Sequence, residues 1–246
     1  MYFRKTGLLI ISILLAMPLL LSCFRDVENR KFEAFTNAFF SWYFRANPIS
    51  ATWIGVHDYD HLLDDMSPEA MKIRLKTLKD FKLKMKEIDL DRLSAENNID
   101  YRILMENLDE MIFHLEELKE YQWNPINYVS AVGFSIMQLI TQDFAPLEER
   151  LRNVYLRAGA IPAFLEQAKE NLKTAPRIHV ETAIKQNRGT IAIFKKEIYK
   201  YSEGAPEELL NRIRIRSDTT ISALKDFGKW LEQSLLPADD KDFRLG

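Results

Sequence analysis

The chain has 246 residues, 47% of them hydrophobic, with 34 basic and 36 acidic side chains and a net charge of −2. The hydrophobic content is too high for a disordered chain, and a near-neutral charge without a long basic run excludes the electrostatic footprint of most nucleic-acid-binding proteins. Only 8 glycines are present, so tight turns between short strands should be scarce, and the single cysteine excludes an intramolecular disulfide and a cysteine-based zinc cluster. This composition predicts a helical globular protein.

The N-terminal residues have the pattern of a bacterial secretory signal. Arg4 and Lys5 precede a charge-free, largely apolar run over residues 6–24. Within this run, residues 20–23 are Leu-Leu-Ser-Cys, which resembles the lipobox whose cysteine is diacylated and becomes the mature N-terminus. Pro18 disfavours the alternative, an uncleaved transmembrane helix with an incidental cysteine.

We therefore predict a signal peptide over residues 1–22, a lipid on Cys23 and a tether over residues 23–30. Two or more acyl chains, such as palmitate, on one cysteine hold a protein stably on a bilayer, because each buried methylene contributes about 0.8 kcal/mol. The expected location is the bacterial cell envelope, outside the cytoplasm, with the membrane contacted through Cys23.

Helical spacing of apolar residues begins next to this tether. Over residues 29–46, aromatic side chains recur at intervals of three or four, which places them on one face of a helix. We expect this aromatic stripe to face the core. Its members are Phe32, Phe35, Phe39 and Trp42.

Two further helices are predicted in the middle of the chain. Ser-Pro-Glu at residues 67–69 provides an N-cap, a proline at the first helical position and an acid in the first turn. Ser94 caps a second helix, which is expected to reach Tyr121 with Ile99 and Ile103 on its apolar face. A short connection joins the two helices, so they should form an antiparallel hairpin.

The remaining sequence also predicts helices. Trp-Asn-Pro at residues 123–125 interrupts the pattern, and the stretch over residues 126–142 is apolar but poorly amphipathic, so it could be buried or line a cleft. Later helices, each opened or closed by a proline or a turn, are predicted over residues 146–158, 162–172, 179–201 and 206–235. The predicted fold is all-α, a multi-helix and predominantly antiparallel array without a substantial β-sheet. It forms one helical domain over residues 31–246.

Histidine spacing gives only weak metal candidates. His57 and His61 are four residues apart, the separation at which a helix presents two imidazoles to one zinc ion, but Gly55 disfavours a continuous helix there. His-Val-Glu at residues 179–181 has the H-x-E pattern of zinc deaminases, whose additional cysteines this chain lacks. We interpret His114 as a structural or surface residue and the His57 segment as a polar helix end.

Several motifs, in order along the chain, resemble the bacterial family called domain of unknown function 885 (DUF885). The first is N-P-x-x-A-T-x-x-G-x-H-x-Y-D at residues 47–60, and the resemblance continues over about residues 28–246. The order of many motifs, rather than any single one, carries the resemblance. The later motifs are Ser67-Pro68-Glu69-Ala70, Asp100-Tyr101, Trp123-Asn124-Pro125 with Tyr128, and residues 143–150, 160–165 and 180–184.

This resemblance implies a mostly α-helical zinc metallopeptidase. In that family the metal site lies in a later C-terminal half, on an H-E-x-x-P-G-H-H helix that these 246 residues do not contain. Zinc is therefore expected only together with that half, and no residue of this chain is assigned as a metal ligand or as catalytic. Seven motif residues are candidates to line a substrate cleft or to stabilise the fold: Asn47, His57, Tyr59, Asp60, Trp123, Asn124 and Tyr128.

Two functions remain open at this point. In the first, the chain is the N-terminal, cleft-forming part of an envelope metallopeptidase and is not catalytic in this form. In the second, it is a non-catalytic helical lipoprotein that acts as a binding or scaffold protein. The expected partners are the membrane, a peptide substrate or the C-terminal half, and not nucleic acid. An unrelated solute-binding lipoprotein would require the motif order to be a coincidence.

The first function predicts an exposed apolar surface where the C-terminal half would dock. Its expected location is the part of the last helix that earlier helices leave open, because a monomer rarely exposes an apolar patch beyond a few hundred Å². The apolar residues of that helix are Ile213, Ile221, Leu224, Phe227, Trp230 and Leu231.

Overall fold

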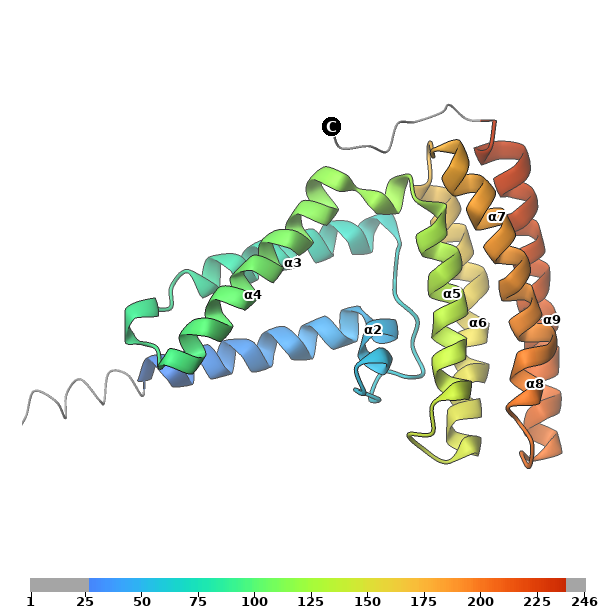
Figure 1. Cartoon of the computed structure of the whole chain (residues 1–246), viewed down its shortest axis with the longest axis horizontal. Coiled ribbons are helices and arrows are strands. Elements are labelled where there is room, and N and C mark those ends of the chain that lie inside the picture. The colour runs from blue at the N-terminus through green and yellow to red at the C-terminus, as the bar shows by residue number, and fades with distance from the viewer. Residues whose placement is uncertain (1–26, 238–246) are drawn as a thin grey trace, which may run out of the picture. The chain divides into compact units, whose positions relative to one another are not determined.

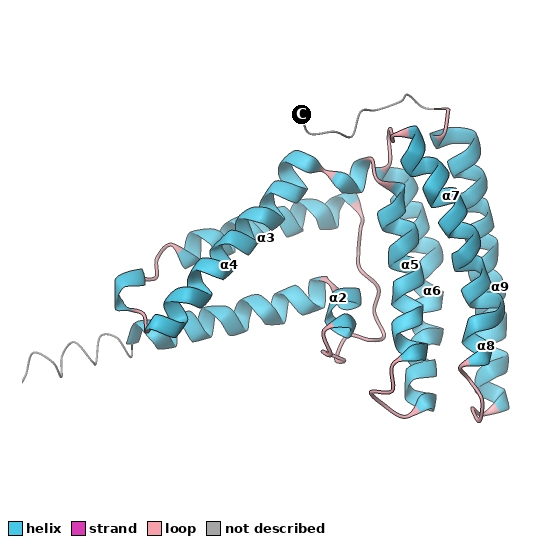
Figure 2. Ribbon diagram, viewed as in Figure 1, coloured by secondary structure: helices cyan, strands magenta, loops and turns pink. Residues whose placement is uncertain are grey.

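The computed structural model of the chain describes residues 27–237. These residues form helices joined by turns and loops, and no β-strand occurs among them (Figure 1, Figure 2). The predicted all-α fold is confirmed. The predicted signal peptide and Cys23 lie outside the described residues.

Within residues 27–237, none of the helices combines the length and the apolarity needed to cross a bilayer.

Contacts between residues divide the chain into two compact units. Of the described residues, unit 1 contains 27–41 and 76–113, and unit 2 contains 42–75 and 114–237. The single helical domain predicted over residues 31–246 stays a prediction.

Unit 1 is made of helices around an aromatic core. The first helix covers residues 27–46 and contributes its first part to this unit. The second part of α3 (Pro68–Met85) and the whole of α4 (Ala95–Phe113) complete it, with the 3-10 turn η1 (Leu90–Arg92) between them.

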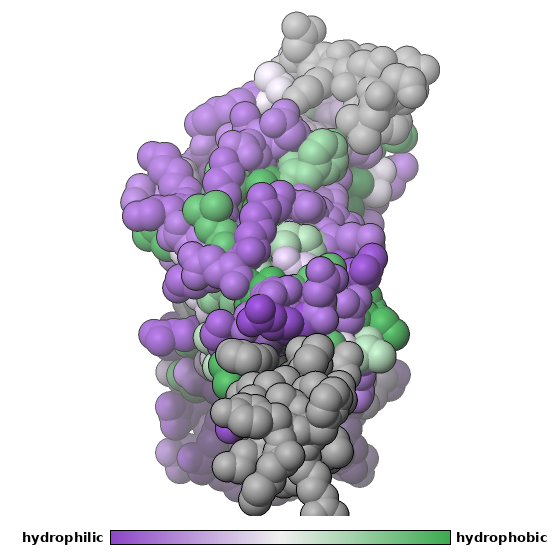
Figure 3. All heavy atoms as spheres, turned by 90° about the vertical axis from the view of Figure 1, so that its left-hand side faces the viewer, coloured by the Kyte–Doolittle hydropathy of each residue, from purple (hydrophilic) through white to green (hydrophobic). Residues whose placement is uncertain are grey.

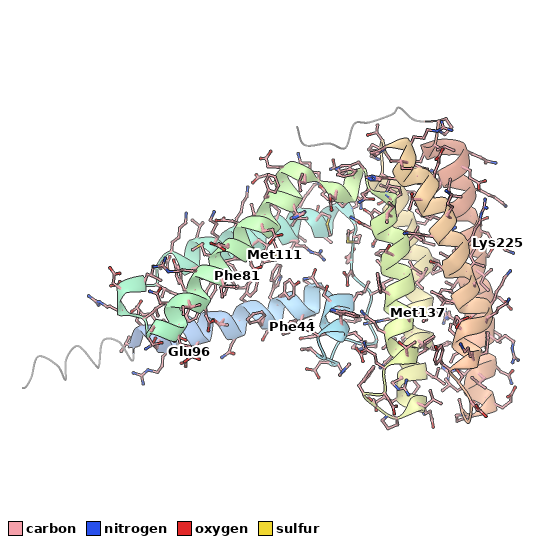
Figure 4. The ribbon with its side chains drawn as sticks, viewed as in Figure 1. Phe44, Phe81, Glu96, Met111, Met137 and Lys225 are labelled. Atoms are coloured by element: carbon pink, nitrogen blue, oxygen red, sulfur yellow. The ribbon has the colours of Figure 1, made fainter. Side chains whose placement is uncertain are left out.

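Aromatic side chains of the first helix pack on α3, as the stripe predicts. The ring of Phe81, which is labelled in Figure 4, lies edge-on to those of Phe35 and Phe39, with centroids 5.7 and 5.4 Å apart. Such edge-to-face pairs are favourable beyond the area that they bury. Phe32 and Leu78 are 3% and 1% exposed, so these residues belong to the core of unit 1.

The start of the first helix is held against the connection between α3 and α4. The carboxylate of buried Glu28 accepts hydrogen bonds from the Asp89 backbone N–H and from Lys31 Nζ, each at 3.0 Å. The Asn29 side-chain oxygen accepts from the Ser94 backbone N–H at 2.9 Å. Residues 27–30 of the predicted tether are therefore helical and bonded to unit 1.

The apolar face predicted for α4 was wrong. Ile99 and Ile103 are 59% and 53% exposed, whereas Leu104 and Leu108 are 7% and 0% exposed. Apolar residues occur on more than one side of α4, and the row through Leu104 and Leu108 packs into the core.

The side of the molecule drawn in Figure 3 is mostly hydrophilic, and its hydrophobic residues are separated by polar ones.

The second stretch of unit 2 begins at residue 114, where the helix predicted to reach Tyr121 ends early. After α4, a π-type turn η2 (His114–Leu118) is closed by Lys119, whose φ of 50° is left-handed, and the 3-10 turn η3 (Glu120–Gln122) follows. Long antiparallel helices then lie side by side (Figure 1). These elements are α5 (Pro125–Thr141), α6 (Leu147–Asn171), α7 (Arg177–Ala192) with η4 (Ile193–Glu197) and α8 (Ile198–Lys200), and α9 (Glu207–Trp230) with η5 (Leu231–Leu235).

The poorly amphipathic stretch before residue 142 forms α5. Val132, Ile136 and Leu139 are each 0% exposed, and the short helix α2 (Pro48–Trp53) packs against α5. Of the two alternatives left open by the sequence, burial is therefore the one observed for most of this helix.

The two helices predicted over residues 146–158 and 162–172 are one continuous helix, α6, with Pro162 inside it. A proline has no N–H, so the Ala158 carbonyl loses its helical donor. The Thr220 hydroxyl of α9 donates to that carbonyl at 2.9 Å and replaces the missing bond. The prediction of a break was wrong because this compensation comes from a residue distant in sequence.

The apolar surface expected on the last helix is covered. α9 packs against α6 and α7, and of the six apolar residues predicted to form an open face only Trp230 is partly exposed. Ile213, Leu224 and Phe227 are each 0% exposed. The expectation of an open face here was wrong, because the earlier helices of unit 2 bury it.

Candidate functional site

The first family motif forms α2 and the turns that follow it. Pro48 occupies the first position of α2, where its missing N–H removes no helical bond. The helix ends in a Schellman motif: Gly55 has a φ of 89°, its N–H bonds the Thr52 carbonyl at 3.2 Å, and the Val56 N–H bonds the Ala51 carbonyl at 2.8 Å. From Val56 to Met66 the chain has no helix.

Arg157 of α6 lies behind this segment and is 0% exposed. Its Nε donates to the Leu62 carbonyl at 2.8 Å, and one Nη donates to the Ser135 carbonyl at 2.8 Å. The other Nη donates to the Thr52 hydroxyl at 2.6 Å and to the Pro48 carbonyl at 3.2 Å. One guanidinium group thus joins α2, the turn segment, α5 and α6.

The charge of this guanidinium is offset by nearby carboxylates. Burial lowers the pKa of Arg157 to about 10, while the negative charges of Asp60 and Asp64 act in the opposite direction. Asp60 is 1% exposed, and the Thr52 hydroxyl donates to its Oδ1 at 2.6 Å. Buried charges are tolerated when they are paired and hydrogen-bonded in this way.

His57 extends the cluster towards the solvent. Its Nδ1 lies 3.0 Å from the Asp60 Oδ2, and its ring stacks on Phe144 with centroids 3.7 Å apart and an interplanar angle of 7°. The His57 side chain is 32% exposed. We call Thr52, His57, Asp60 and Arg157 the arginine hub.

The end of the segment is tied to α6 by a second chain of hydrogen bonds. The side-chain oxygen of Gln167 accepts from the Met66 N–H at 2.9 Å. The Asn171 side-chain amide donates to the Met66 carbonyl at 2.5 Å and to the Tyr128 hydroxyl at 3.0 Å. Tyr128 in turn donates to the Tyr121 carbonyl at 2.6 Å. Burial raises the pKa of Tyr128 well above its ordinary value, so it acts as a neutral donor.

Two further charged residues support the start of the segment. The carboxylate of Asp64 accepts from the Ile49 N–H at 3.1 Å, and an Nη of Arg74 donates to the Ala46 carbonyl at 2.7 Å. Burial raises the pKa of Asp64 and lowers that of Arg74. Backbone groups on both sides of Pro48 are therefore held by side chains.

Of the predicted site residues, His57 and Asp60 meet in the arginine hub. Asn47 precedes α2, where its amide donates to the Tyr43 carbonyl at 2.8 Å. Tyr59 is half-buried, and its carbonyl accepts from the Leu62 N–H at 2.9 Å.

The other three predicted residues lie around the start of α5. Asn124 is the N-cap, with its side-chain oxygen accepting from the Ile126 N–H at 3.2 Å. The Trp123 indole N–H donates to the Leu118 carbonyl at 2.7 Å, and its ring stacks on His179 with centroids 5.6 Å apart. With Tyr128, these residues fix the turn into α5.

The sequence did not single out Arg157, although its spacing contains a signal. Arg157 follows Val154 by three residues and precedes Ile161 by four, and both of these neighbours are 0% exposed. A charge on the apolar face of a helix predicts a buried cation with carbonyl or carboxylate partners. Which partners these are depends on contacts across more than 90 residues, as in the bond to Leu62.

The residues that the arginine hub holds in place are exposed on their outer side. Trp53 and Ile54 are 63% and 57% exposed, and Leu62 is 37% exposed. His61 is also exposed, in a turn rather than in a helix, so His57 and His61 are not presented together on one helical face. Among the described residues, no group of three or more His, Cys, Asp or Glu side chains could hold a metal ion.

Comparison with known families identifies the chain. The model of a family described as "Bacterial protein of unknown function (DUF885)" matches residues 48–246. The chain belongs to the DUF885 family. The matched region contains the arginine hub and the turn into α5, so the resemblance seen in the sequence motifs is confirmed at the family level.

A solved structure shares this fold. It is described as a "putative lipoprotein of unknown function from Shewanella oneidensis", is 28% identical in sequence and superimposes with a TM-score of 0.74. The match covers 82% of this chain and 37% of the Shewanella protein, so the chain spans little more than a third of that relative's length. No curated protein sequence matches the chain.

Proposed function

We propose that this DUF885 chain is an envelope-anchored lipoprotein that forms the cleft-lining part of a zinc metallopeptidase and is not catalytic on its own. The lipobox at Cys23 supports the location, as does the description of the Shewanella relative as a putative lipoprotein. The observation that carries the proposed role is the construction of residues 47–66 around the arginine hub.

A wall that positions a substrate needs a fixed backbone and outward-facing side chains. In residues 47–66, Arg157 binds the carbonyls of Pro48 and Leu62, while Trp53 and Ile54 remain mostly exposed. Ligand sites are lined mainly by apolar and aromatic side chains with a few polar groups. The exposed indole of Trp53, with His57 and His61 in the following turns, provides such a combination of aromatic and polar groups for binding a peptide.

Zinc enters this proposal only with the H-E-x-x-P-G-H-H helix that the family resemblance implies. The described residues do not fit the ion, because the Nδ1 of His57 faces Asp60 and His61 stands apart in an exposed turn. In this proposal the residues of this chain bind and orient the peptide.

Peptide binding by the full chain tests the proposal. A mixture of peptides from a digested envelope protein, labelled for fluorescence anisotropy, should bind, and Trp53→Ala should weaken binding about tenfold because an exposed aromatic anchor is lost. Phe134→Ala is the matched control, since Phe134 is 57% exposed on α5 of the same unit. Equal effects of the two substitutions, or no peptide binding at all, would reject the cleft-wall role and favour a scaffold protein.

The envelope location is tested separately. Intact-mass measurement of membrane-extracted protein should show the loss of residues 1–22 and the mass of acyl chains on Cys23. Cys23→Ser should abolish this processing, and a mature form that retains Met1 would contradict the lipoprotein assignment.

A further inference from the structure

α9 carries the sequence Arg-Ile-Arg-Ile-Arg at residues 212–216. Because a helix brings residues four apart onto one side, Arg212 and Arg216 share a face while Arg214 points elsewhere. Tyr155 of α6 lies between the two arginines: the guanidinium carbons of Arg212 and Arg216 are 4.7 and 4.8 Å from the centre of its ring. Two cations therefore converge on one phenol.

Arg216 is held in a defined position. Its Nη2 donates to the Tyr155 hydroxyl at 2.9 Å. One turn further along α6, a Cβ added at Gly159 would lie 3.3 Å from the guanidinium carbon and Nη1 of Arg216, closer than most real contacts of a Cβ. The missing side chain at Gly159 thus gives the guanidinium room to pack against α6.

The charge of this arginine pair is not balanced by a carboxylate. Within residues 27–237, neither Arg212 nor Arg216 forms an ion pair, whereas Arg152 on α6 pairs with Glu148 at 2.5 Å. The Tyr155 oxygen accepts from Arg216, and no described residue accepts its hydroxyl hydrogen. The hydrogen bond from Arg216 and then the interaction with neighbouring Arg212 lower the pKa of Tyr155 below its ordinary value.

These donors line a pocket of about 280 Å³, together with Thr219 and with Ile215, which is 72% exposed. This volume lies at the small end of the range for ligand pockets and leaves room for a phosphate group. Guanidinium groups bind phosphate through paired hydrogen bonds, and a phosphate monoester carries about −1.5 to −2 charges at neutral pH, which matches two cations.

We propose that the pocket of Tyr155, Arg212 and Arg216 binds a phosphate group, either inorganic phosphate or the headgroup of an anionic phospholipid. The two guanidinium groups supply the charge, and the Tyr155 hydroxyl donates to one phosphate oxygen. Exposed Ile215 at the rim is compatible with both ligands, since its side chain can face solvent beside a free phosphate or contact the acyl chains of a phospholipid. This inference does not depend on the peptidase-related role of residues 47–66.

Binding to the full chain in non-ionic detergent tests the proposal with two probes. Inorganic phosphate is titrated by calorimetry, and dihexanoyl phosphatidic acid is titrated against dihexanoyl phosphatidylcholine, which has the same acyl chains. Arg216→Gln should weaken binding by about tenfold or more, because charge-assisted hydrogen bonds are lost. Gly159→Ala should weaken it less, since it only displaces Arg216.

Arg214→Gln is the matched control. It removes the same charge from the same helix, but Arg214 bonds Asn211 at 2.7 Å and lies near Tyr199 instead of the pocket. Thermal unfolding verifies that each variant is folded, and exposed Arg212→Gln replaces Arg216→Gln if the latter is not. If Arg216→Gln weakens the binding of inorganic phosphate, the ligand is a free anion. If it weakens only the binding of phosphatidic acid, the ligand is a lipid headgroup. An equal loss in Arg214→Gln, equally tight binding of acetate, or binding of neither probe overturns the proposal.

Discussion

Arg157 and the pair Arg212 and Arg216 belong to the same unit, but their guanidinium groups have different surroundings. Arg157 is fully buried and donates to three carbonyls and one hydroxyl, with Asp60 and Asp64 nearby. The pair on α9 contacts a single phenol at the edge of a pocket. A cation whose donors are occupied by its own chain stabilises structure, whereas a cation with unused donors next to open space is available to a ligand.

The largest effect expected from this comparison is on stability. Arg157→Met should lower the free energy of unfolding by about 3–5 kcal/mol, because it leaves three buried carbonyls without their donor and removes the positive charge that offsets Asp60. Urea-induced unfolding measures this loss. Arg212→Met is the control, since the same substitution at an exposed site should cost less than about 1 kcal/mol.

If Arg157→Met lowers the free energy of unfolding by less than Arg212→Met does, the distinction between the two arginine sites is wrong. If Arg157→Met does not fold at all, Thr52→Val provides a milder test. It keeps the shape of the side chain but removes the hydroxyl between Arg157 and Asp60, which should cost about 1–3 kcal/mol. No measurable loss in Thr52→Val would show that the hub is not a cooperative network.

The next effect concerns α6, the helix that carries both Arg157 and Tyr155. Thr220→Val should destabilise the chain by about 1–3 kcal/mol, because the Ala158 carbonyl left without a donor by Pro162 would then be buried and unsatisfied. Thr219→Val is the neighbouring control, with an exposed hydroxyl that reaches its own helix at 3.4 Å. Similar unfolding midpoints for the two variants would mean that Thr220 does not compensate for the proline.

Periodicity and capping predict most of the helices of this chain correctly. The aromatic stripe with Phe35 and Phe39, the N-cap at Asn124 and the final helix all follow from local chemistry, which a single sequence contains. The continuity of α6 does not follow from it, since Pro162 is an unfavourable residue there and its compensation comes from Thr220. Local rules fail where a distant side chain replaces a missing backbone bond.

The same reasoning separates the two arginine sites. The motif residues His57 and Asp60 were identified from the sequence, but Arg157, which reaches Asp60 through the Thr52 hydroxyl, is about 100 residues away and outside the family motifs. Arg212 and Arg216 have helical spacing, which predicts a shared face but not Tyr155 between them. The spacing of residues along a helix can be read from the sequence. Whether the N–H groups of an arginine have acceptors within the chain depends on tertiary contacts, which cannot.

A smaller effect is expected in the pH dependence of stability around the arginine hub. Burial raises the folded-state pKa of Asp64 above its ordinary 3.8, so its contribution to stability is complete below that value and is lost as the pH rises through the folded-state pKa. The wild type should therefore lose stability relative to Asp64→Asn on going from acid to neutral pH. Urea midpoints of both proteins across this range measure the difference. If the wild type instead gains stability relative to Asp64→Asn as the pH rises, the positive charges of Arg157 and Arg74 affect the pKa of Asp64 more than burial does.

The smallest effect is a change in the titration of one phenol, without a change in fold. Tyr155 receives a hydrogen bond from Arg216, lies next to Arg212 and should titrate below the ordinary pKa of 10.0, whereas buried Tyr128 should titrate above it. NMR of ¹³C-labelled tyrosines separates the two resonances, which are assigned with Tyr155→Phe and Tyr128→Phe. Arg216→Met should raise the pKa of Tyr155 towards 10.0 and leave Tyr128 unaffected, since the strongest donor to the phenolate is lost. An unchanged Tyr155 would show that Arg216 does not hold its charge against the phenol, and the pocket would then lack the fixed cation on which phosphate binding depends.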